Sequence, residues 1–309
     1  MIKSLYLILI FNVGFSTILN SQQETLCQFE HPQMGTLWKL SIYADDSIKA
    51  QSIAKEAFLL LDNLNTIFSD YDQHSKLNQL CAQAGSGQWV NIDTALWEVL
   101  QYAKLLHQQS RGAFDISVGP LTKIWRRAFR RQVFPSSEKL MLAQQLVKNQ
   151  WIKVKHDRPL AQLKKKGMQL DLGGIAKGYT LDRIGALLEA KGLYHYLIDG
   201  GGDLLLGLAP PKRKGWAIAF PDGSGKILER CAVATSGAKY HYIEYKGQKY
   251  SHLIDPRTGF GITEEKTISV IAPNGMIADA WASALSILSI EEIQKVPIRF
   301  LDGIYYIIY

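Results

Sequence analysis

The order of helical and extended segments constrains the fold of this chain more than any other sequence feature. Apolar residues recur at helical spacing over 46–68, and the capping residues Asp93 and Thr94 predict a second helix over 91–109. From Tyr194 onward, short extended segments are separated by glycine, proline and aspartate. Because there is no regular βαβ rhythm, we predict an α+β fold of mixed, largely antiparallel sheets packed with helices.

The remaining elements follow from the same patterns of apolar spacing and turn residues. Further helices are expected over 135–149, 174–190 and 277–288. Strands are expected over 37–43, 196–198, 203–206, 216–220, 227–230, 250–254 and 267–271. A closing hairpin is expected from 298–301 and 304–308, turning at Asp302 and Gly303.

The first residues resemble an export signal. Lys3 precedes an apolar run over 5–15 that is short for a bilayer span, so 1–22 is interpreted as a signal peptide, with a retained N-terminal membrane anchor as the alternative. The 309-residue chain is 47% hydrophobic, which is enough for a sizeable core, and one folded domain is expected over 23–309. The expected location is outside the cytoplasm.

Charge and cysteine content limit the classes of partner. The net charge is +7, with basic clusters at 126–131 and 164–166. They are either solvated faces or a surface that attracts an anionic cofactor or an acidic partner, and no nucleic-acid partner is expected. The three cysteines form no CxxC pair, so a structural zinc site is not expected. An odd number leaves at least one thiol unpaired. The sequence is compatible with one disulfide or with three buried thiols.

Five short clusters of polar or charged residues, most of them with glycine, lie at element boundaries. They cover 112–121, 171–179, 199–203, 251–259 and 279–283. In the second cluster, a strand is expected to end at Asp171 and a helix to begin near Gly174. Adjacent glycines there expose backbone N–H groups, and Lys177 adds a cation, which predicts an anion site. The glycine spacing fits neither a dinucleotide-binding fingerprint nor a P-loop.

Two other clusters carry side chains suited to catalysis. Asp279 and Ser283 are four residues apart and share a helix face, which suits the oxygen ligands of Mg²⁺; the structural alternative is that Asp279 caps the helix. His252 is a candidate general base, since an ordinary histidine has a pKa near ~6.5. The alternative for its segment is a plain turn in which Asp255 caps its own backbone.

The clusters at 112–121 and 199–203 each have a structural interpretation when taken alone. The segment 112–121 is then a loop with a capping aspartate, and 199–203 is a tight hairpin turn. The five clusters in this order, preceded by Met34-Gly35-Thr36 and by 68–72, nevertheless resemble the FAD:protein FMN transferase (ApbE) family. The resemblance implies an ApbE-like fold with a flavin transferase catalytic domain over 23–309.

The resemblance also implies residue roles. Met34 and Tyr71 would lie beside the isoalloxazine, where Tyr71 offers an aromatic face. The other cofactor-contacting positions would be Ala113, Phe114, Asp115, Asp171, Lys177 and Thr267. The ligands of Mg²⁺ would be the carbonyl of Gly174 with Asp279 and Ser283. The family usually has threonine where Ser283 stands, and serine keeps the hydroxyl.

The implied reaction moves FMN from FAD to a threonine or serine hydroxyl of an acceptor protein and releases AMP. His252 or Asp279 would accept the hydroxyl proton, and the sequence leaves both open. The implied partner is an acceptor flavoprotein of a membrane electron-transfer system, in the periplasm or on the outer face of the inner membrane. Two alternatives are an FAD pyrophosphatase that gives FMN and AMP, and a flavin-binding protein without turnover.

Overall fold

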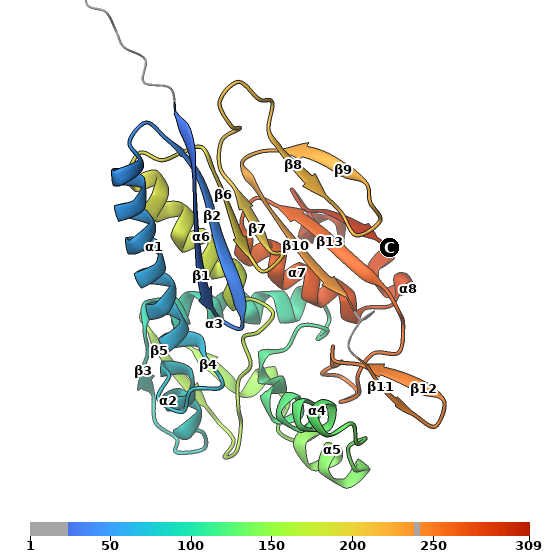
Figure 1. Ribbon diagram of the computed structural model, residues 1–309. Coiled ribbons are helices and arrows are strands. Elements are labelled where there is room, and N and C mark those ends of the chain that lie inside the picture. Colours follow the sequence, from blue (N-terminus) through green and yellow to red (C-terminus); the bar gives the residue numbers. More distant parts are fainter. Residues whose placement is uncertain (1–23, 238–241) are drawn as a thin grey trace, which may run out of the picture.

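The protein is described by a computed structural model that covers residues 24–237 and 242–309. Its largest sheet has seven strands in the order β1-β2-β6-β7-β10-β13-β14, and each neighbouring pair is antiparallel (Figure 1). These strands are β1 (Thr25–Gln33), β2 (Thr36–Ala44), β6 (Tyr196–Gly200), β7 (Leu204–Leu206), β10 (Cys231–Gly237), β13 (Thr267–Ala272) and β14 (Tyr305–Ile308). The predicted α+β class with largely antiparallel sheets is confirmed.

Helices cover one face of the seven-stranded sheet, and further helices lie beyond the lower end of that sheet in Figure 1. The helices are α1 (Ser47–Phe68), α2 (Lys76–Ala82), α3 (Thr94–Gln109), α4 (Gly119–Arg131), α5 (Ser137–Gln144), α6 (Ala176–Ala190), α7 (Gly275–Ile287) and α8 (Ile290–Gln294). Helices α1, α6 and α7 pack on each other and on the strands (Figure 1). The face is apolar because Trp38, Leu40 and Ile42 alternate along β2 and are fully buried.

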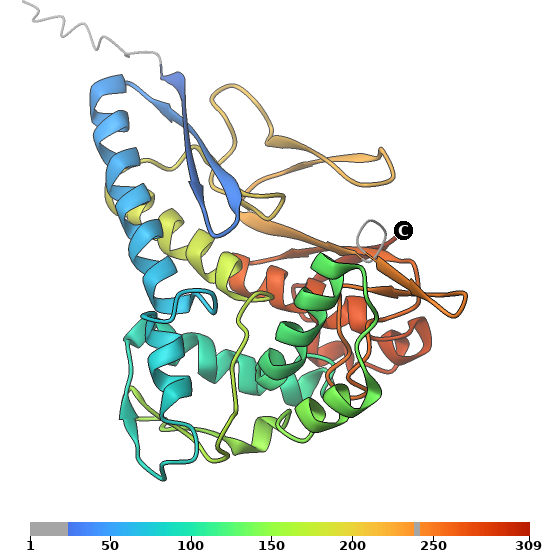
Figure 2. The ribbon, with the colours of Figure 1, turned by 60° about the horizontal axis from the view of Figure 1, so that its bottom comes forward.

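Three small sheets complete the fold. They are formed by β3 (Val90–Asn91), β5 (Leu160–Leu163) and β4 (Ile152–Val154), by β8 (Trp216–Ala219) and β9 (Gly225–Leu228), and by β11 (Tyr242–Tyr245) and β12 (Gln248–Ser251). Figure 2 shows α4 and α5 beside the β11–β12 hairpin. A separate apolar cluster joins them, in which Leu121 and Trp125 of α4 pack with Leu140 of α5 and Ile243 of β11.

The contact between α6 and α7 is unusually close because both helices present glycine. A Cβ at Gly178 would lie 2.7 Å from the Cβ of Asp279 and would overlap the carbonyl oxygen of Gly275. A Cβ at Gly275 would lie 2.5 Å from the carbonyl oxygen of Gly178. The two glycines therefore allow the start of α6 to lie directly against α7.

Several predicted boundaries are wrong. Residue Asp171 does not end a strand: it lies in irregular chain, tied by its N–H to the carbonyl of Ile116 at 2.8 Å. The expected closing hairpin is half correct. The turn at Gly303 exists, but 298–300 forms a 3₁₀ turn, and β14 pairs with the free edge of β13 instead. The helix expected over 135–149 ends at Gln144.

Other predicted segments are displaced or outside the described chain. Strands β9 and β12 each begin two residues earlier than expected. The proposed leader over 1–22 lies outside the described residues. Within the described part of the chain, no helix combines the length and apolar character that a membrane crossing requires. The three cysteines Cys27, Cys81 and Cys231 are free thiols.

Candidate active site

A cavity of about 490 Å³ lies between the start of α6, the inner face of α7, the end of β10 and the loops before α4 and after β12. Most of the residues that the sequence singled out line it together. They are Ala113, Phe114, Asp115, Asp171, Gly174, Lys177, His252, Asp279 and Ser283. Segments more than one hundred residues apart in the chain therefore meet at one site.

The start of α6 and the middle of α7 supply the oxygen-rich wall. The carboxylate of Asp279 accepts a hydrogen bond from the N–H of Gly178 at 3.0 Å. One helical turn later, Ser283 faces Gly174, where a Cβ would lie 2.7 Å from the serine Oγ. Asp279 does not cap α7, since Asn274 does so through its side chain. Its carboxylate is thus available to the cavity and to the N-terminus of α6.

Buried charges dominate the electrostatics of this wall. Burial raises the pKa of Asp279 to about 7, with a further increase from the negative charge of Asp203 and opposition from Lys177. Lys177 forms an ion pair with Asp203. Burial alone would lower the pKa of Lys177, but the charges of Asp203 and Asp279 outweigh it and the pKa is raised. Lys177 therefore keeps its positive charge at the cavity.

The donors on this wall fit a magnesium ion. The carboxylate of Asp279, the hydroxyl of Ser283 and the backbone at Gly174 are all hard oxygen groups. Among residues 24–237 and 242–309, no group of three or more His, Cys, Asp or Glu is placed to hold a metal. A cation here would rely on one carboxylate and on oxygens of the bound ligand. Mg²⁺ accepts such an arrangement because it commonly binds one or two carboxylates together with substrate phosphates.

Arg126 of α4 links this cavity to its neighbours. Its guanidinium pairs with Asp70 and with Asp171, the latter at 3.0 Å, and lies 4.5 Å from the ring centroid of Tyr71. Burial opposes its charge, but the two carboxylates raise its pKa. The Arg126 side chain lines an adjoining cavity of about 530 Å³, together with Met34, Tyr71 and Lys177. The two residues expected beside the isoalloxazine therefore share a cavity next to the oxygen-rich wall.

The turn after β12 places His252 at the mouth of the site. His252 is exposed and lines the 490 Å³ cavity. The following residues form a rigid turn: Arg257 binds Asp255 at 2.8 Å and Glu292 at 2.7 Å. Asp255 also accepts the N–H of Arg257, so the structural interpretation of this turn is confirmed for Asp255. The turn is fastened to α4 by the indole N–H of Trp125, which donates to the carbonyl of Gly259.

Two further predicted residues, Asp115 and Thr267, are placed less favourably for contact with a ligand. The Asp115 carboxylate caps its own turn by accepting the N–H and hydroxyl of Ser117, at 2.8 and 2.6 Å. Thr267 is not on the wall of either cavity; it lies on β13 opposite Gly237, the last residue of β10. Gly237 itself lines the 490 Å³ cavity.

Sequence reasoning missed three contributors. Arg126 belongs to the basic cluster interpreted either as a solvated face or as a surface that attracts an anion. Asp203 belongs to the expected hairpin turn, and Thr235 lies on the unpredicted strand β10. A signal for Arg126 was present. Leu121, Trp125 and Ala128 mark a helix whose buried face leaves Arg126 at its edge.

Comparisons with known proteins agree with this arrangement. The ApbE family model matches residues 34–307. A relative from Treponema pallidum named FAD:protein FMN transferase is 34% identical over 283 residues, covering 84% of this chain and 78% of its own. A crystal structure of the Pseudomonas stutzeri flavinyl transferase ApbE superposes with a TM-score of 0.81 at 27% identity, covering 92% of this chain and 90% of its own.

A second solved structure, the flavin transferase ApbE from Vibrio cholerae, gives a TM-score of 0.80 at 25% identity and covers 92% of this chain and 93% of its own. The family match spans most of the 309 residues, and each of the two solved structures covers 92% of the chain. The chain belongs to the ApbE family.

Proposed function

We propose that this chain is a Mg²⁺-dependent FAD:protein FMN transferase, which moves FMN from FAD to a threonine or serine hydroxyl of an exported flavoprotein and releases AMP. One observation carries the proposal. Asp279 and Ser283 of α7 contact Gly178 and Gly174 at the start of α6, and this contact lies beside the cavity lined by Tyr71. The curated relatives with the transferase name supply the reaction class.

In this proposal, the flavin occupies the cavity of Met34 and Tyr71, and the diphosphate lies along the wall formed by Lys177, Asp279 and Ser283. Tyr71 is 76% exposed and offers a flat aromatic surface for the ring. Lys177 keeps its charge and attracts the phosphate oxygens. When bound to Asp279, Ser283 and the carbonyl of Gly174, Mg²⁺ would offset phosphate charge and polarise the phosphoryl group.

The acceptor hydroxyl attacks the phosphorus on the FMN side of the diphosphate. A new bond forms between the hydroxyl oxygen and this phosphorus. The bond from the phosphorus to the bridging oxygen breaks, and AMP leaves with that oxygen. His252 lies at the cavity mouth and accepts the hydroxyl proton. The acceptor must be held in place during this step, since positioning supplies much of the rate of a two-substrate transfer.

Co-expression with a flavoprotein acceptor, followed by mass spectrometry of that acceptor, tests the proposal. The expected result is an added FMN mass on one threonine or serine, lost when Asp279 is replaced by Ala. Rapid AMP release from FAD and Mg²⁺ without any acceptor would instead support the FAD pyrophosphatase. A yellow protein that retains intact FAD with Mg²⁺ present would support the non-catalytic flavin-binding alternative.

The proposed place of action is outside the cytoplasm, either periplasmic or on the outer face of the inner membrane. Its support is the sequence of the first residues, with Lys3 followed by an apolar run. The acceptor would then be a flavoprotein of a membrane electron-transfer system that faces the same compartment. Cell fractionation of the tagged full chain tests this, and recovery in the cytoplasm alone would contradict it.

A further inference from the structure

A third cavity, of about 850 Å³, adjoins the site and lies between α4 and α2. Its lining includes four cationic side chains of α4: Lys123, Arg126, Arg127 and Arg130. Arg126 and His252 line both this cavity and the 490 Å³ cavity of the active site. This third cavity, called the α4 cleft below, therefore adjoins the place where the acceptor hydroxyl must arrive. It also shares Asp70, Tyr71 and Arg126 with the 530 Å³ cavity.

Three of the four positive charges in the α4 cleft have no carboxylate partner among the described residues. Arg126 pairs with Asp70 and Asp171, whereas Lys123, Arg127 and Arg130 form no ion pair with any residue of 24–237 or 242–309. These three side chains are exposed. Like charges three and four residues apart on a helix repel one another, so this arrangement costs helix stability. The cost is understandable if the charges serve an anionic partner.

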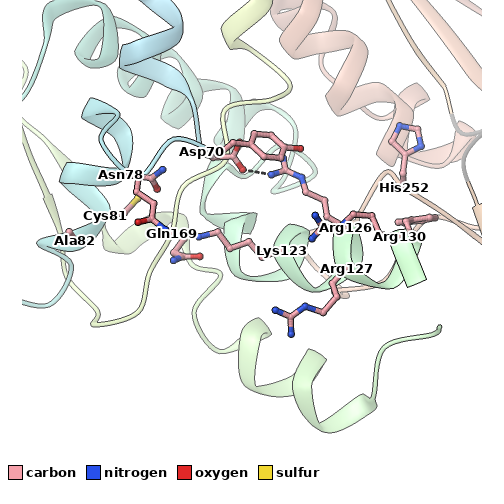
Figure 3. Close-up of a pocket in the computed structure, with 13 residues that line it drawn as sticks. Asp70, Asn78, Cys81, Ala82, Lys123, Arg126, Arg127, Arg130, Gln169 and His252 are labelled. Atoms are coloured by element: carbon pink, nitrogen blue, oxygen red, sulfur yellow. Dashed lines mark hydrogen bonds and ion pairs between the residues drawn. The ribbon is translucent and has the colours of Figure 1, made fainter. Parts of the chain in front are cut away.

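Figure 3 shows how these side chains lie. Arg126 extends toward Asp70, at the inner end of the α4 cleft. Lys123 extends toward Gln169, and Asn78 and Cys81 of α2 lie across from it, whereas Arg127 points away from Arg126. The cleft is thus lined by separated cations along its length and does not concentrate them at one point.

The spacing of the charges favours an extended polypeptide over a single small anion. From Lys123 to Arg130 the helix rises by about 10 Å, close to the length of three residues of an extended chain. The wall also contains amide and aromatic side chains, among them Gln73, Gln169 and Phe129. Amides can bind peptide backbone groups and Phe129 can contact apolar side chains, whereas a lone phosphate would use only the cations.

We propose that the α4 cleft docks an acidic polypeptide segment of the acceptor protein, so that its hydroxyl reaches His252. This inference rests on the proposed transferase function. It assigns to Lys123, Arg127 and Arg130 a role in acceptor recognition that is separate from the binding of FAD. Electrostatic complementarity of this kind increases the association rate and selects among partners.

The test compares two triple variants of the full chain. In one, Lys123→Gln, Arg127→Gln and Arg130→Gln remove the charges of the cleft. Glutamine is used because a new carboxylate on α4 would compete for Arg126. In the control, Lys164→Gln, Lys165→Gln and Lys166→Gln remove three charges from a basic run that lines neither the cleft nor the active-site cavity.

The probe is a fluorescein-labelled peptide of alternating aspartate and serine around one threonine, with an asparagine-for-aspartate peptide for comparison. Fluorescence anisotropy at low salt should show that the acidic peptide binds the wild-type protein and the control variant. The cleft variant should bind it at least about tenfold more weakly, and added salt should weaken wild-type binding. FAD affinity, measured by flavin fluorescence with Mg²⁺, should be unchanged in both variants. The melting temperature of the cleft variant should be no lower than that of the wild type, because the repulsion along α4 is relieved.

Equal peptide binding by the wild type and the cleft variant would overturn the proposal, as would no peptide binding by the wild type at low salt. A parallel loss of FAD affinity in the cleft variant would assign these charges to the dinucleotide instead. Binding to phosphatidylglycerol vesicles that needs the three charges, without peptide binding, would assign the cleft to a lipid surface. If the wild type fails to bind FAD, the proposed function fails, while the peptide measurement still reports on the cleft.

Discussion

The carboxylate of Asp279 accepts a hydrogen bond from the backbone N–H of Gly178, which lies 101 residues earlier in the chain. This bond joins the middle of α7 to the first turn of α6 and holds the carboxylate at the wall of the active-site cavity. The same group is buried, and burial raises its pKa. The residue that the proposed reaction needs as a cation ligand is therefore positioned by a helix N-terminus.

Replacing Asp279 by Asn should separate its charge from its packing. The asparagine oxygen can still accept the N–H of Gly178, so the fold should remain, but the charge that would bind Mg²⁺ is lost. We expect transferase activity to fall by about 10²–10³-fold, the usual effect of removing one electrostatic group at a reacting centre. AMP release at saturating FAD with the acceptor protein present, in this assay and in the next, measures the loss, and circular dichroism serves as the control. Near-wild-type turnover would remove Asp279 from the proposed mechanism.

Ser283 offers a graded test of the same wall. Ser283→Ala removes the hydroxyl that faces Gly174 and should increase the Mg²⁺ concentration needed for half-maximal activity. Ser283→Thr keeps the hydroxyl and should retain the wild-type requirement. A Mg²⁺ titration of AMP release distinguishes the two variants. The same titration curve for wild type and Ser283→Ala would show that the hydroxyl is not a ligand.

Gly178→Ala should destabilise the protein, although alanine normally favours a helix over glycine by about 1 kcal/mol. The new Cβ would lie 2.7 Å from the Cβ of Asp279, so α6 and α7 must separate. We expect a loss of about 1–3 kcal/mol in the free energy of unfolding, measured with urea. Gly225→Ala is the matched control because its nearest neighbour, the carbonyl oxygen of Ile218, would lie at an ordinary 3.4 Å. Equal stability of the two variants would contradict the packing argument.

Local signals explain which parts of the fold could be predicted from the sequence. The caps Asp46 and Asp93 start α1 and α3 as expected, because capping depends on neighbouring residues alone. Strand β10 is not predicted because its first half is buried on both faces: Ala232 and Ala234 belong to the core that includes α7, and Val233 packs with the β8–β9 hairpin. Such a strand, made here of small residues, lacks the alternation of a half-exposed strand.

The site was predictable where its chemistry lies within one short segment. Asp279 and Ser283 share a helix face, and Gly174 and Lys177 share one turn, so spacing was informative. The bridge made by Arg126 could not be predicted in this way. Its partner Asp70 lies 56 residues before it and Asp171 lies 45 residues after it, so only the tertiary fold brings them together.

Replacing Tyr71 should weaken flavin binding with little change in the free energy of unfolding. Its side chain is exposed, and its ring contact within the protein is with the guanidinium of Arg126. Tyr71→Ala should weaken FAD binding by about tenfold or more, since aromatic stacking of a base contributes roughly 1–3 kcal/mol. Tyr71→Phe keeps the ring and should bind FAD like the wild type. Flavin fluorescence titration measures both. Loss of affinity in the phenylalanine variant would indicate a role for the hydroxyl instead of the ring.

Asp182 gives a pH dependence of stability that can be isolated. It accepts the N–H groups of Gly275 and Met276 at 2.5 and 2.9 Å, at the start of α7. Burial raises its pKa from 3.8 to about 6. Because the folded pKa exceeds the unfolded one, its contribution is fully present below about pH 4 and is lost as the pH rises through about 6. The loss is at most roughly 3 kcal/mol.

An Asp182→Asn variant has no such titration. Between about pH 4 and pH 7, its free energy of unfolding should therefore fall less than that of the wild type, by up to roughly 3 kcal/mol. Urea unfolding at several pH values gives the difference between the two curves. This difference reports Asp182 together with the smaller increase that its charge causes in the pKa of Asp279. Parallel curves would mean that Asp182 has a similar pKa in the folded and unfolded protein.

His252 and Asp279 are the two candidates for accepting the hydroxyl proton, and their positions predict different outcomes on substitution. His252 is exposed at the mouth shared by the α4 cleft and the active-site cavity, whereas Asp279 is buried beneath it. His252→Ala should lower the transfer rate at saturating FAD by about 10²–10⁴-fold, the usual range for a general base. FAD affinity should change little, because the proposed flavin and diphosphate contacts are made by other side chains, namely Tyr71, Lys177, Asp279 and Ser283. Single-turnover formation of the FMN-linked acceptor measures the rate, and a wild-type rate in His252→Ala would leave Asp279 as the base.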